Sequence, residues 1–486
     1  MKQISLKKNF VMNVILTVTT FIFPLITFPY ISRILHADGM GKVSFATSIV
    51  TYFNMFAQLG IPTYGIKICA GYREDKVKLT KTVQELMVIN LITTILSYTG
   101  LLICLTFVQK LQNDKVLLLI VSSTIILNTI GMEWLYKAME QYTYITIRSI
   151  AFKIIALLFT FVLIHSSEDY IIYGAISIFA ASASNILNLI NARNIISFKP
   201  LKNLNIRQHL TKVLVFFAMS CATTVYTNLD TVMLGFMTSD VDVGYYNAAV
   251  KIKAILVSIV TSLGTVLLPR SSFYVKNKMI EEFKKITFKA IGFVCVCATP
   301  LFIYFMLFAP EGIRFLSGSG YDGSIAPMRL IMPTLLLIGL SNIIGVQVLI
   351  PLGKEKIVLY SEVGGALTDL IANMLLIPQY TASGAAIGTL LAEFVVLLIQ
   401  YIAMRKELKE MFRAISCWKI VVAVVAASAI AVCIKIMKFN SFVSLICSGT
   451  LFFSVYILVL LTIKERFTLE MTNQIITKAK QMYNRN

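Results

Sequence analysis

Residues 441–463 read SFVSLICSGTLFFSVYILVLLTI, and none of these 23 residues carries a charge. An α-helix needs about 20 apolar residues to cross the hydrocarbon core of a bilayer. Thirteen further stretches of similar length and character precede this one, beginning at Phe10. With 57% hydrophobic and 14% charged residues in a chain of 486, the composition excludes a water-soluble globule. The sequence therefore predicts a polytopic membrane protein with about fourteen transmembrane helices.

The predicted fold class is all-α. Hydrocarbon offers no partner to a backbone N–H or C=O, and continuous apolar runs satisfy these groups within one helix. Strands of a membrane barrel would instead alternate in polarity over about ten residues. The expected spans are 10–32, 43–66, 84–108, 115–136, 143–164, 169–192, 212–237, 243–269, 287–309, 324–351, 356–378, 381–404, 417–437 and 441–463.

The net charge of +20 is distributed unevenly among the loops. About three quarters of the 44 Lys and Arg residues lie at the two ends and in alternate loops, for example in 67–81, 193–212 and 270–289. Loops rich in Lys and Arg stay on the cytoplasmic side of a membrane. The pattern predicts that both termini are cytoplasmic and gives no reason to expect a nucleic-acid partner.

The eight cysteines and three histidines form no metal-binding pattern, because neither CxxC nor HExxH occurs. The loops are short, and no P-loop or glycine-rich nucleotide turn is present. We expect no metal site, no cofactor and no enzymatic activity.

A weak internal repeat has an offset of about 203 residues. Gly41–Ile49 aligns with Gly244–Ile252, and Leu59-Gly60 falls near Leu263-Gly264. Two parallel six-helix copies would place a substrate site between them and suit alternating access. The predicted domains are an N-lobe (1–205, spans 1–6), a C-lobe (206–410, spans 7–12) and an appendage (411–486, spans 13 and 14 with a cytoplasmic tail).

Several motifs, in this order and spacing, resemble one family of transporters: Ile31–Gly41, Leu59–Lys67, Trp134–Glu140, Gly244–Ala249, Asn342–Gly353, Asn373–Pro378 and Gly384–Glu393. The chain resembles the Wzx-type polysaccharide-transport flippases of the multidrug/oligosaccharidyl-lipid/polysaccharide (MOP) exporter superfamily. It departs from their usual pattern at His36, Lys67 and Thr381.

This resemblance implies a MATE-like fold and a flippase in the inner membrane of a bacterium. Its substrate would be an undecaprenyl-diphosphate-linked oligosaccharide for O-antigen or capsule synthesis. Its expected partners would be membrane lipids and the polymerase and glycosyltransferases of the same pathway. The alternatives are a cation-coupled multidrug antiporter of the same superfamily and, with less support, a polyprenyl-dependent glycosyltransferase or polymerase. The glycan, the coupling ion and the oligomeric state are left open.

Basic residues within or at the ends of spans are candidates for binding the diphosphate. Lys153 lies near the middle of its span, where an isolated cation is costly, so it should face water, an anion or a partner. A structural ion pair is the alternative. The further substrate-binding candidates are Arg33, Lys67, Arg148, Lys251 and Lys253.

Acidic residues within spans are candidates for ion coupling or gating. Glu362 and Asp369 are seven residues apart, which places them on one helix face, and Glu393 lies near mid-depth in the next span. Asp230 and Lys251 are predicted at similar depth on adjacent antiparallel helices, where they could form a salt bridge. These carboxylates could equally serve to neutralise or hydrogen-bond neighbouring groups.

Overall fold

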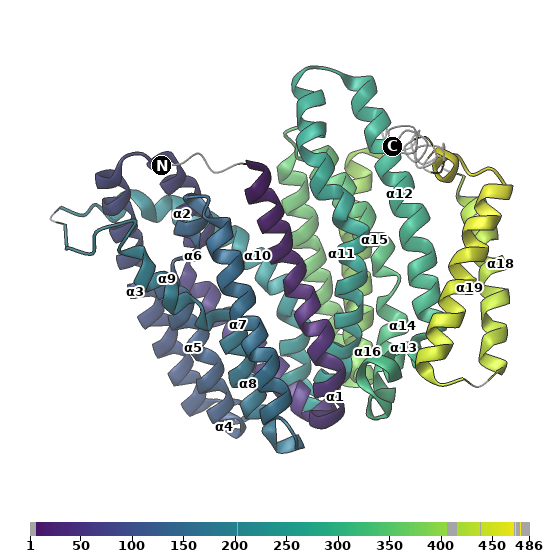
Figure 1. Ribbon diagram of the computed structural model, residues 1–486, viewed down its shortest axis with the longest axis horizontal. Coiled ribbons are helices and arrows are strands. Elements are labelled where there is room, and N and C mark those ends of the chain that lie inside the picture. Colours follow the sequence, from purple (N-terminus) through teal and green to yellow (C-terminus); the bar gives the residue numbers. More distant parts are fainter. Residues whose placement is uncertain are drawn as a thin grey trace, which may run out of the picture. The chain divides into compact units, whose positions relative to one another are not determined.

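The computed structural model describes residues 6–201, 203–405, 416–437, 439–470, 472 and 477. These residues form helices joined by short turns, and no strand occurs among them (Figure 1). The predicted all-α fold is confirmed. Most of the predicted cytoplasmic tail lies outside the described residues.

The chain divides by internal packing into two compact units, unit 1 (Met1–Gly244) and unit 2 (Tyr245–Asn486). This boundary lies later than residue 205, where the repeat places the end of the first six-helix copy. The seventh expected span therefore packs with unit 1. The predicted division into two six-helix copies was based on the sequence repeat, not on which helices pack together. It stays a prediction.

Unit 1 is a bundle in which helices from the whole first half of the chain contact one another (Figure 1). Its elements are α1 (Leu6–Gln58), α2 (Ile61–Gly71), α3 (Lys76–Phe107), α4 (Gln109–Asn113), α5 (Lys115–Gly131), α6 (Glu133–Ala138), α7 (Tyr142–Leu163), η1 (Ser167–Asp169), α8 (Tyr170–Ile178), the π-helix η2 (Phe179–Ala183), α9 (Asn185–Ala192) and α10 (Arg207–Met237).

Unit 2 is also a helical bundle. Helix α11 (Asp240–Lys276) begins in unit 1 and continues into unit 2. The other elements are α12 (Ile280–Leu307), α13 (Ala309–Ser317), η3 (Ser319–Ser324), α14 (Ile325–Ile331), α15 (Thr334–Asn342), the π-helix η4 (Ile343–Leu349), α16 (Glu355–Ala403), α18 (Cys417–Ile436) and α19 (Ser441–Thr462).

Ten described helices are long and apolar enough to cross a membrane, or eleven if a bent pair around Pro333 counts as one span. Two of the long helices contain a break, at His36 (φ 54°) in α1 and at Thr381 (φ 46°) in α16. Each of these helices covers two of the expected spans, and α5 is a short apolar helix of 17 residues. The multi-pass membrane fold is thus confirmed, whereas the number fourteen stays a prediction.

The outward faces of the helices carry large apolar side chains. On α3, for example, Leu91, Ile92, Ile95 and Leu96 are all more than half exposed. A water-soluble protein would not leave such a continuous apolar face uncovered. In a membrane this face meets lipid.

Polar side chains join α10 to the rest of unit 1. His209 on α10 is buried, and its Nε2 lies 2.8 Å from Glu85 Oε2 on α3 while its Nδ1 lies 2.9 Å from the Tyr64 hydroxyl on α2. The second Glu85 oxygen accepts the backbone N–H of Asn205 at 2.7 Å. These bonds tie the segment before α10 to α3, which accounts for the packing of α10 with unit 1.

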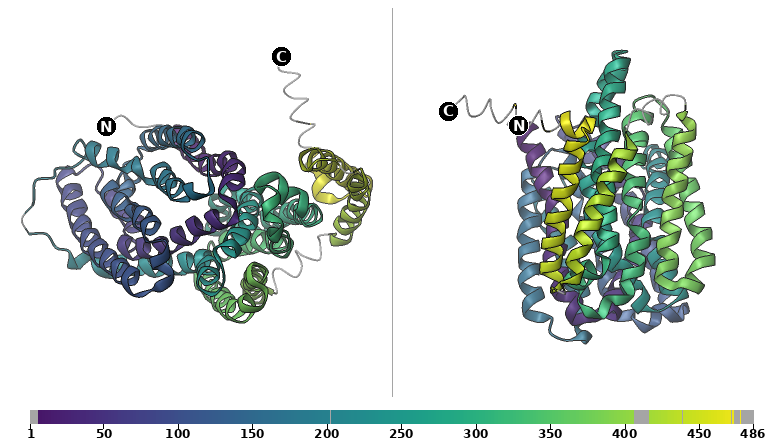
Figure 2. Two further views of the ribbon diagram at one scale, coloured as in Figure 1. Left: turned by 90° about the horizontal axis from the view of Figure 1, so that it is seen from below. Right: turned by 90° about the vertical axis from the view of Figure 1, so that its right-hand side faces the viewer.

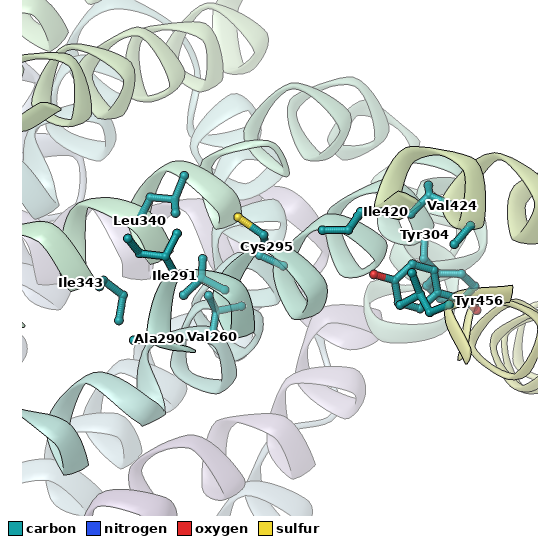
Figure 3. Packing of buried hydrophobic residues seen from close by; sticks show 14 of the residues in the cluster. Val260, Ala290, Ile291, Cys295, Tyr304, Leu340, Ile343, Ile420, Val424 and Tyr456 are labelled. Carbon is teal, nitrogen blue, oxygen red and sulfur yellow. The ribbon is translucent and has the colours of Figure 1, made fainter. Parts of the chain in front are cut away.

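The core of unit 2 extends from α12 to the last two helices (Figure 3). Tyr304 on α12 donates a hydrogen bond to the Leu445 carbonyl of α19 at 2.8 Å, and Tyr456 on α19 donates one to the Val296 carbonyl at 2.8 Å. Helices α18 and α19 lie side by side at the edge of this unit (Figure 2). The expected appendage is therefore packed onto α12.

Candidate functional site

A cavity of about 230 Å³ lies between the helices of unit 1. Its wall combines amides, one acidic residue, one basic residue and three apolar groups. The lining residues are Asn54, Gln58, Pro62, Ile66, Asn128, Glu133, Trp134, Lys137 and Asn185.

Two breaks in the helices place these side chains around the cavity. Gly60 adopts φ 72° between α1 and α2, a conformation that favours glycine, and α2 then begins with a proline in its first turn. Met132, with φ 41°, ends α5 and starts α6, so that Glu133 stands in the first turn of α6. A Cβ atom added at Gly131 would lie 2.4 Å from Asn185 Cβ. Glycine at this position therefore allows α5 to approach α9.

A network of amides crosses the cavity. Asn128 donates to Asn54 Oδ1 at 3.3 Å and accepts from Asn185 Nδ2 at 3.1 Å and from the Ser182 hydroxyl at 3.3 Å. Ser182 belongs to the π-helix η2, a type of irregularity that is frequent at functional sites. Gln58 donates to the Thr129 hydroxyl at 3.4 Å.

Charged groups gather on one side of the cavity around Glu133. This carboxylate lies 2.9 Å from Lys137 Nζ and 3.5 Å from a guanidinium nitrogen of Arg148. The Arg148 side chain is only 3% exposed and also donates to the Ser184 carbonyl at 3.0 Å. Lys153, on the same helix as Arg148, is close enough to interact electrostatically with Glu133, and it donates to the Thr19 hydroxyl of α1 at 3.3 Å. Two cations, Lys137 and Arg148, therefore contact one carboxylate, and a third, Lys153, lies on the helix of Arg148.

The structure brings two of the candidate cations, Arg148 and Lys153, into one cluster. Arg33 and Lys67 lie apart from it: both are exposed, and Arg33 hydrogen-bonds the Pro29 carbonyl of its own helix. The sequence reasoning missed Glu133. Its signal was a carboxylate at the end of an apolar run, directly before the Trp134–Glu140 motif.

In unit 2 the candidate carboxylates differ in burial. Asp369 and Glu393 are 2% and 7% exposed. They lie on the two segments of α16, called its first and second legs, which precede and follow the break at Thr381. A Cβ atom added at Gly388, on the second leg, would lie 3.1 Å from Asp369 Oδ1. Glu362, on the same helix, is exposed, and its predicted role in ion coupling or gating stays a prediction. Close packing against the second leg covers Asp369, which lies two turns further along the helix.

Lys251 and Lys253 are half-buried on α11. Near them on the same helix, Tyr246 forms a hydrogen bond of 2.9 Å with Thr389 of α16. Asp230 is 7% exposed in unit 1, whereas Lys251 belongs to unit 2. Their salt bridge stays a prediction.

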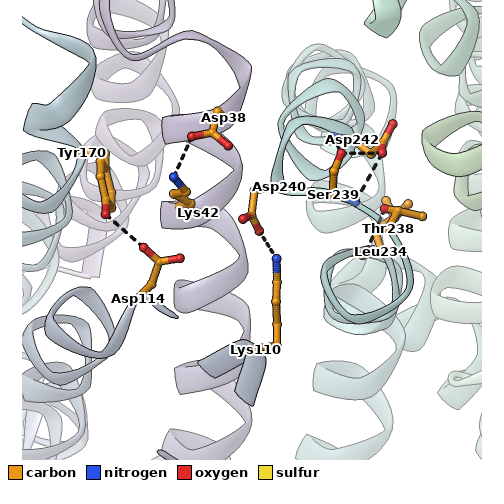
Figure 4. A network of polar contacts seen from close by, with 10 residues as sticks. All are labelled: Asp38, Lys42, Lys110, Asp114, Tyr170, Leu234, Thr238, Ser239, Asp240 and Asp242. Atoms are coloured by element: carbon orange, nitrogen blue, oxygen red, sulfur yellow. Dashed lines mark hydrogen bonds and ion pairs between the residues drawn. The ribbon is translucent and has the colours of Figure 1, made fainter. Parts of the chain in front are cut away.

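A second polar network in unit 1 joins the ends of several helices (Figure 4). Lys110 pairs with Asp240 at 2.8 Å, Asp38 pairs with Lys42 at 2.7 Å, and the Tyr170 hydroxyl donates to Asp114 at 3.1 Å. Close by, a Cβ atom at Gly41 would lie 1.7 Å from the Asp240 carbonyl oxygen. The network thus accompanies a close backbone approach between α1 and the first residue of α11.

The sequence around the cavity has a second copy in unit 2. Asn128-Thr-Ile-Gly131-Met-Glu133 matches Asn342-Ile-Ile-Gly345-Val-Gln347, which lies 214 residues later. The surroundings correspond as well, because a Cβ at Gly131 would meet Asn185 and a Cβ at Gly345 would meet the amide of Gln400 at 3.1 Å. Each unit therefore has a glycine that faces an amide on a neighbouring helix.

A multi-pass helical bundle with charged and polar groups enclosed among its helices is typical of membrane transporters. Residues 6–275, more than half of the chain, match the family described as polysaccharide biosynthesis protein, and residues 216–375 match the MatE family. The chain belongs to the polysaccharide biosynthesis protein family. Its resemblance to the polysaccharide-transport flippases of the MOP superfamily is confirmed.

The chain is similar over nearly the full length of two curated relatives. It is 23% identical to a putative O-antigen transporter of Escherichia coli K12, over 83% of this chain and 98% of that protein. It is 24% identical to a putative O-antigen transporter of Shigella dysenteriae, over 82% of this chain and 100% of that protein.

Among solved structures, the chain is similar to the lipid II flippase MurJ in an inward closed conformation. The TM-score is 0.71 at 16% identity, over 93% of this chain and 98% of MurJ. An outward-facing MATE multidrug transporter of the MOP superfamily gives a TM-score of 0.50 at 13% identity, over 82% of this chain and 94% of that one. The expected MOP-like, MATE-like fold is confirmed.

Proposed function

We propose that this protein is a flippase that moves undecaprenyl-diphosphate-linked oligosaccharide repeat units across a bacterial cytoplasmic membrane for surface polysaccharide synthesis. The names of its relatives, putative O-antigen transporters, support a cargo of this class. The observation that carries the proposal is the pairing of Lys137 and Arg148 with the carboxylate of Glu133, with Lys153 on the same helix as Arg148, beside a polar cavity among membrane-spanning helices.

The cargo explains why such a cluster would be retained. The polar groups of a diphosphate and a sugar chain cost several kcal/mol each when they leave water for hydrocarbon, whereas the polyprenyl tail is at home in lipid. An excess of cations lowers this cost for the diphosphate, and a guanidinium can bind phosphate oxygens in pairs. Arg148 and Lys153 are the proposed headgroup contacts, and Arg33, Lys67, Lys251 and Lys253 are proposed further contacts along the path.

Transport by alternating access needs a source of energy, and an ion gradient is the proposed source. Asp369 and Glu393 are the strongest coupling candidates, since both are buried within the membrane-spanning part of unit 2. Asp230 is the corresponding candidate in unit 1. Glu362 is the weakest of the four, because it is exposed.

An antiporter of organic cations would need an acidic or aromatic cavity. The carboxylate on the cavity wall, Glu133, already lies beside Lys137 and Arg148, so the wall does not present free negative charge. We therefore favour the flippase over the drug antiporter, and over an enzyme that would transfer or polymerise sugars. Both termini are proposed to be cytoplasmic, and the polymerase and glycosyltransferases of the same pathway are the proposed partners.

The proposed function is tested in cells that lack this protein. Undecaprenyl-diphosphate-linked repeat units should accumulate in the inner leaflet while surface polysaccharide falls, and the wild-type chain should reverse both effects. Normal surface polymer without accumulation would overturn the flippase assignment.

Lys153→Ala gives a sharper test in the same cells. It should lower export severalfold while the protein still inserts, because it removes a cation from the headgroup cluster. Lys78→Ala is the matched control, since Lys78 is an exposed lysine whose partner is a neighbouring aspartate of the same helix end. Undiminished export in the Lys153 variant would remove this residue from the site.

A further inference from the structure

The cavity of unit 1 has features that packing alone does not require. Its amides could serve only to hold the helices together, since polar side chains commonly join helices in membranes. The second copy of the motif in unit 2 provides an internal comparison for that simpler role. There, Gln347 and Gln400 are 1% and 2% exposed, and Gln400 donates to the Ser361 hydroxyl at 3.1 Å.

The first copy differs by opening onto a cavity. Among the described residues, unused hydrogen-bonding atoms occur in both copies, but those of the second copy, Gln347 Nε2 and Gln400 Oε1, are buried, whereas those of the first belong to residues that line the cavity. Glu133 and Lys137 are 37% and 35% exposed on the cavity wall. Among the residues that the structure describes, Asn54 Nδ2 donates no hydrogen bond and Gln58 Oε1 accepts none, although the Gln58 side chain is only 8% exposed. Both atoms belong to residues that line the cavity. The wall therefore offers at least one donor and one acceptor to a guest.

The chemistry of the wall identifies the kind of guest. Four amides, from Asn54, Gln58, Asn128 and Asn185, present donors and acceptors together, which matches hydroxyl groups that both donate and accept. An apolar part of the wall, formed by Pro62, Ile66 and Trp134, can cover the C–H face of a ring. This combination suits a hydroxylated ring.

The volume of the cavity and the charges beside it narrow the kind of guest that it can bind. The cavity, at about 230 Å³, is smaller than the roughly 300 Å³ at which pockets for drug-sized ligands begin, so it suits one ring rather than an oligosaccharide. The cations beside Glu133 disfavour an organic cation. A metal ion is also disfavoured, because the described residues contain no group of three or more His, Cys, Asp or Glu side chains that could hold one.

We propose that the cavity of unit 1 binds a single sugar ring of the transported glycan, with Asn54, Gln58, Asn128 and Asn185 contacting its hydroxyl groups. This inference rests on the proposed function, because the ring belongs to the glycan that the flippase would carry. The cluster around Glu133 adjoins the cavity, so a ring bound there lies next to the groups proposed for the diphosphate.

The chain offers a built-in reporter for this site. It contains two tryptophans, Trp134 on the cavity wall and Trp418 on α18 in unit 2. The substitution Trp418→Phe leaves Trp134 as the only source of tryptophan emission. The purified protein in detergent is titrated with methyl glycosides of glucose, galactose, mannose, N-acetylglucosamine and glucuronic acid.

At least one of these glycosides should change the Trp134 emission in a saturable manner, with half-saturation in the millimolar range that a single small ring can reach. Asn128→Leu, which keeps the volume but removes the amide, should weaken this binding by about tenfold. The matched control is Asn342→Leu, which makes the same change in the second copy and should leave the binding unchanged. Thermal unfolding of both variants checks that they fold, and Asn54→Leu replaces Asn128→Leu if the latter does not.

Two results would overturn the proposal: no glycoside changes the emission, or the Asn128 and Asn342 variants bind equally well. The export assay separates this failure from failure of the proposed function. If the wild-type chain restores export while no glycoside binds and Asn128→Leu exports normally, the flippase stands and the sugar site is wrong. If the wild-type chain does not reverse the accumulation of lipid-linked units, the proposed function itself is wrong.

Discussion

The two copies of the Asn-x-x-Gly-x-Glu/Gln segment use one scaffold in two ways. In both, a glycine lets a helix approach an amide on its neighbour. In unit 2 the last position is Gln347, which is uncharged and only 1% exposed, and its Nε2 has no hydrogen-bond partner among the described residues. In unit 1 the same position is Glu133, which lies at the edge of a cavity between two cations.

The difference between Glu133 and Gln347 indicates which side chain each environment can hold. A carboxylate is tolerated among membrane helices where cations and an open cavity surround it, as they do around Glu133. A neutral amide is the residue that a closed polar contact can hold, since a buried charge without a partner is costly. Charge and cavity therefore occur together in the first copy, whereas the second copy has uncharged amides that are buried.

The largest effect is expected when the charge of the first copy is moved into the second. Gln347→Glu places a carboxylate where the side chain is 1% exposed, and should destabilise unit 2 by about 3–5 kcal/mol, the usual cost of an uncompensated buried charge. The measurement is thermal unfolding and yield of the purified protein in detergent.

Gln347→Met is the control for this change, because it keeps the length of the side chain without adding charge. The reciprocal change, Glu133→Gln, removes the carboxylate that pairs with the buried Arg148 and should also destabilise the protein. The loss should be smaller than for Gln347→Glu, because Glu133 is 37% exposed and Arg148 keeps its hydrogen bond to the Ser184 carbonyl. Equal unfolding temperatures for Gln347→Glu and wild type would contradict the claim that the second copy is closed.

An effect of intermediate size is expected when the glycine of each copy is replaced by alanine. Gly131→Ala should destabilise unit 1 by about 1–3 kcal/mol, because the new Cβ would lie 2.4 Å from Asn185 Cβ, an atom that cannot move without its helix. Gly345→Ala should change stability by less than about 1 kcal/mol, since its nearest neighbour is the flexible end of Gln400 at 3.1 Å. Thermal unfolding of the two variants checks this, and a larger loss from Gly345→Ala would reverse the expected order.

Much of the fold could be predicted from the sequence, because apolar length alone identifies membrane helices. The long helices cover the expected ranges, such as 441–463 for α19. The positions of the breaks within the long helices were harder to predict. His36 and Thr381 depart from the family pattern at the sites where α1 and α16 bend, but a single residue with positive φ joins two spans so tightly that each pair forms one continuous element.

The site was less predictable than the fold. Arg148 and Lys153 stood out because charge within an apolar run is rare, and the structure brings them together near Glu133. Glu133 itself was missed, since its partners come from a turn of its own helix and from α7, and nothing local indicates the second. The cavity depends on amides from three separate regions of the chain, which no local pattern connects.

The smallest effect is expected at Glu362, which lies 214 residues after Arg148, the same offset that separates the two copies of the Asn-x-x-Gly-x-Glu/Gln segment. Arg148 is buried and paired, whereas Glu362 is exposed, so Glu362→Gln should alter stability by no more than about 0.5 kcal/mol. Export should stay near the wild-type rate, while Asp369→Asn, at a buried carboxylate of the same helix, should lower it severalfold. Export rate and unfolding temperature of both variants are the measurements. If Glu362→Gln lowers export as much as Asp369→Asn, then Glu362 contributes to ion coupling despite its exposure, and the contrast in charge between the two copies extends beyond the cavity.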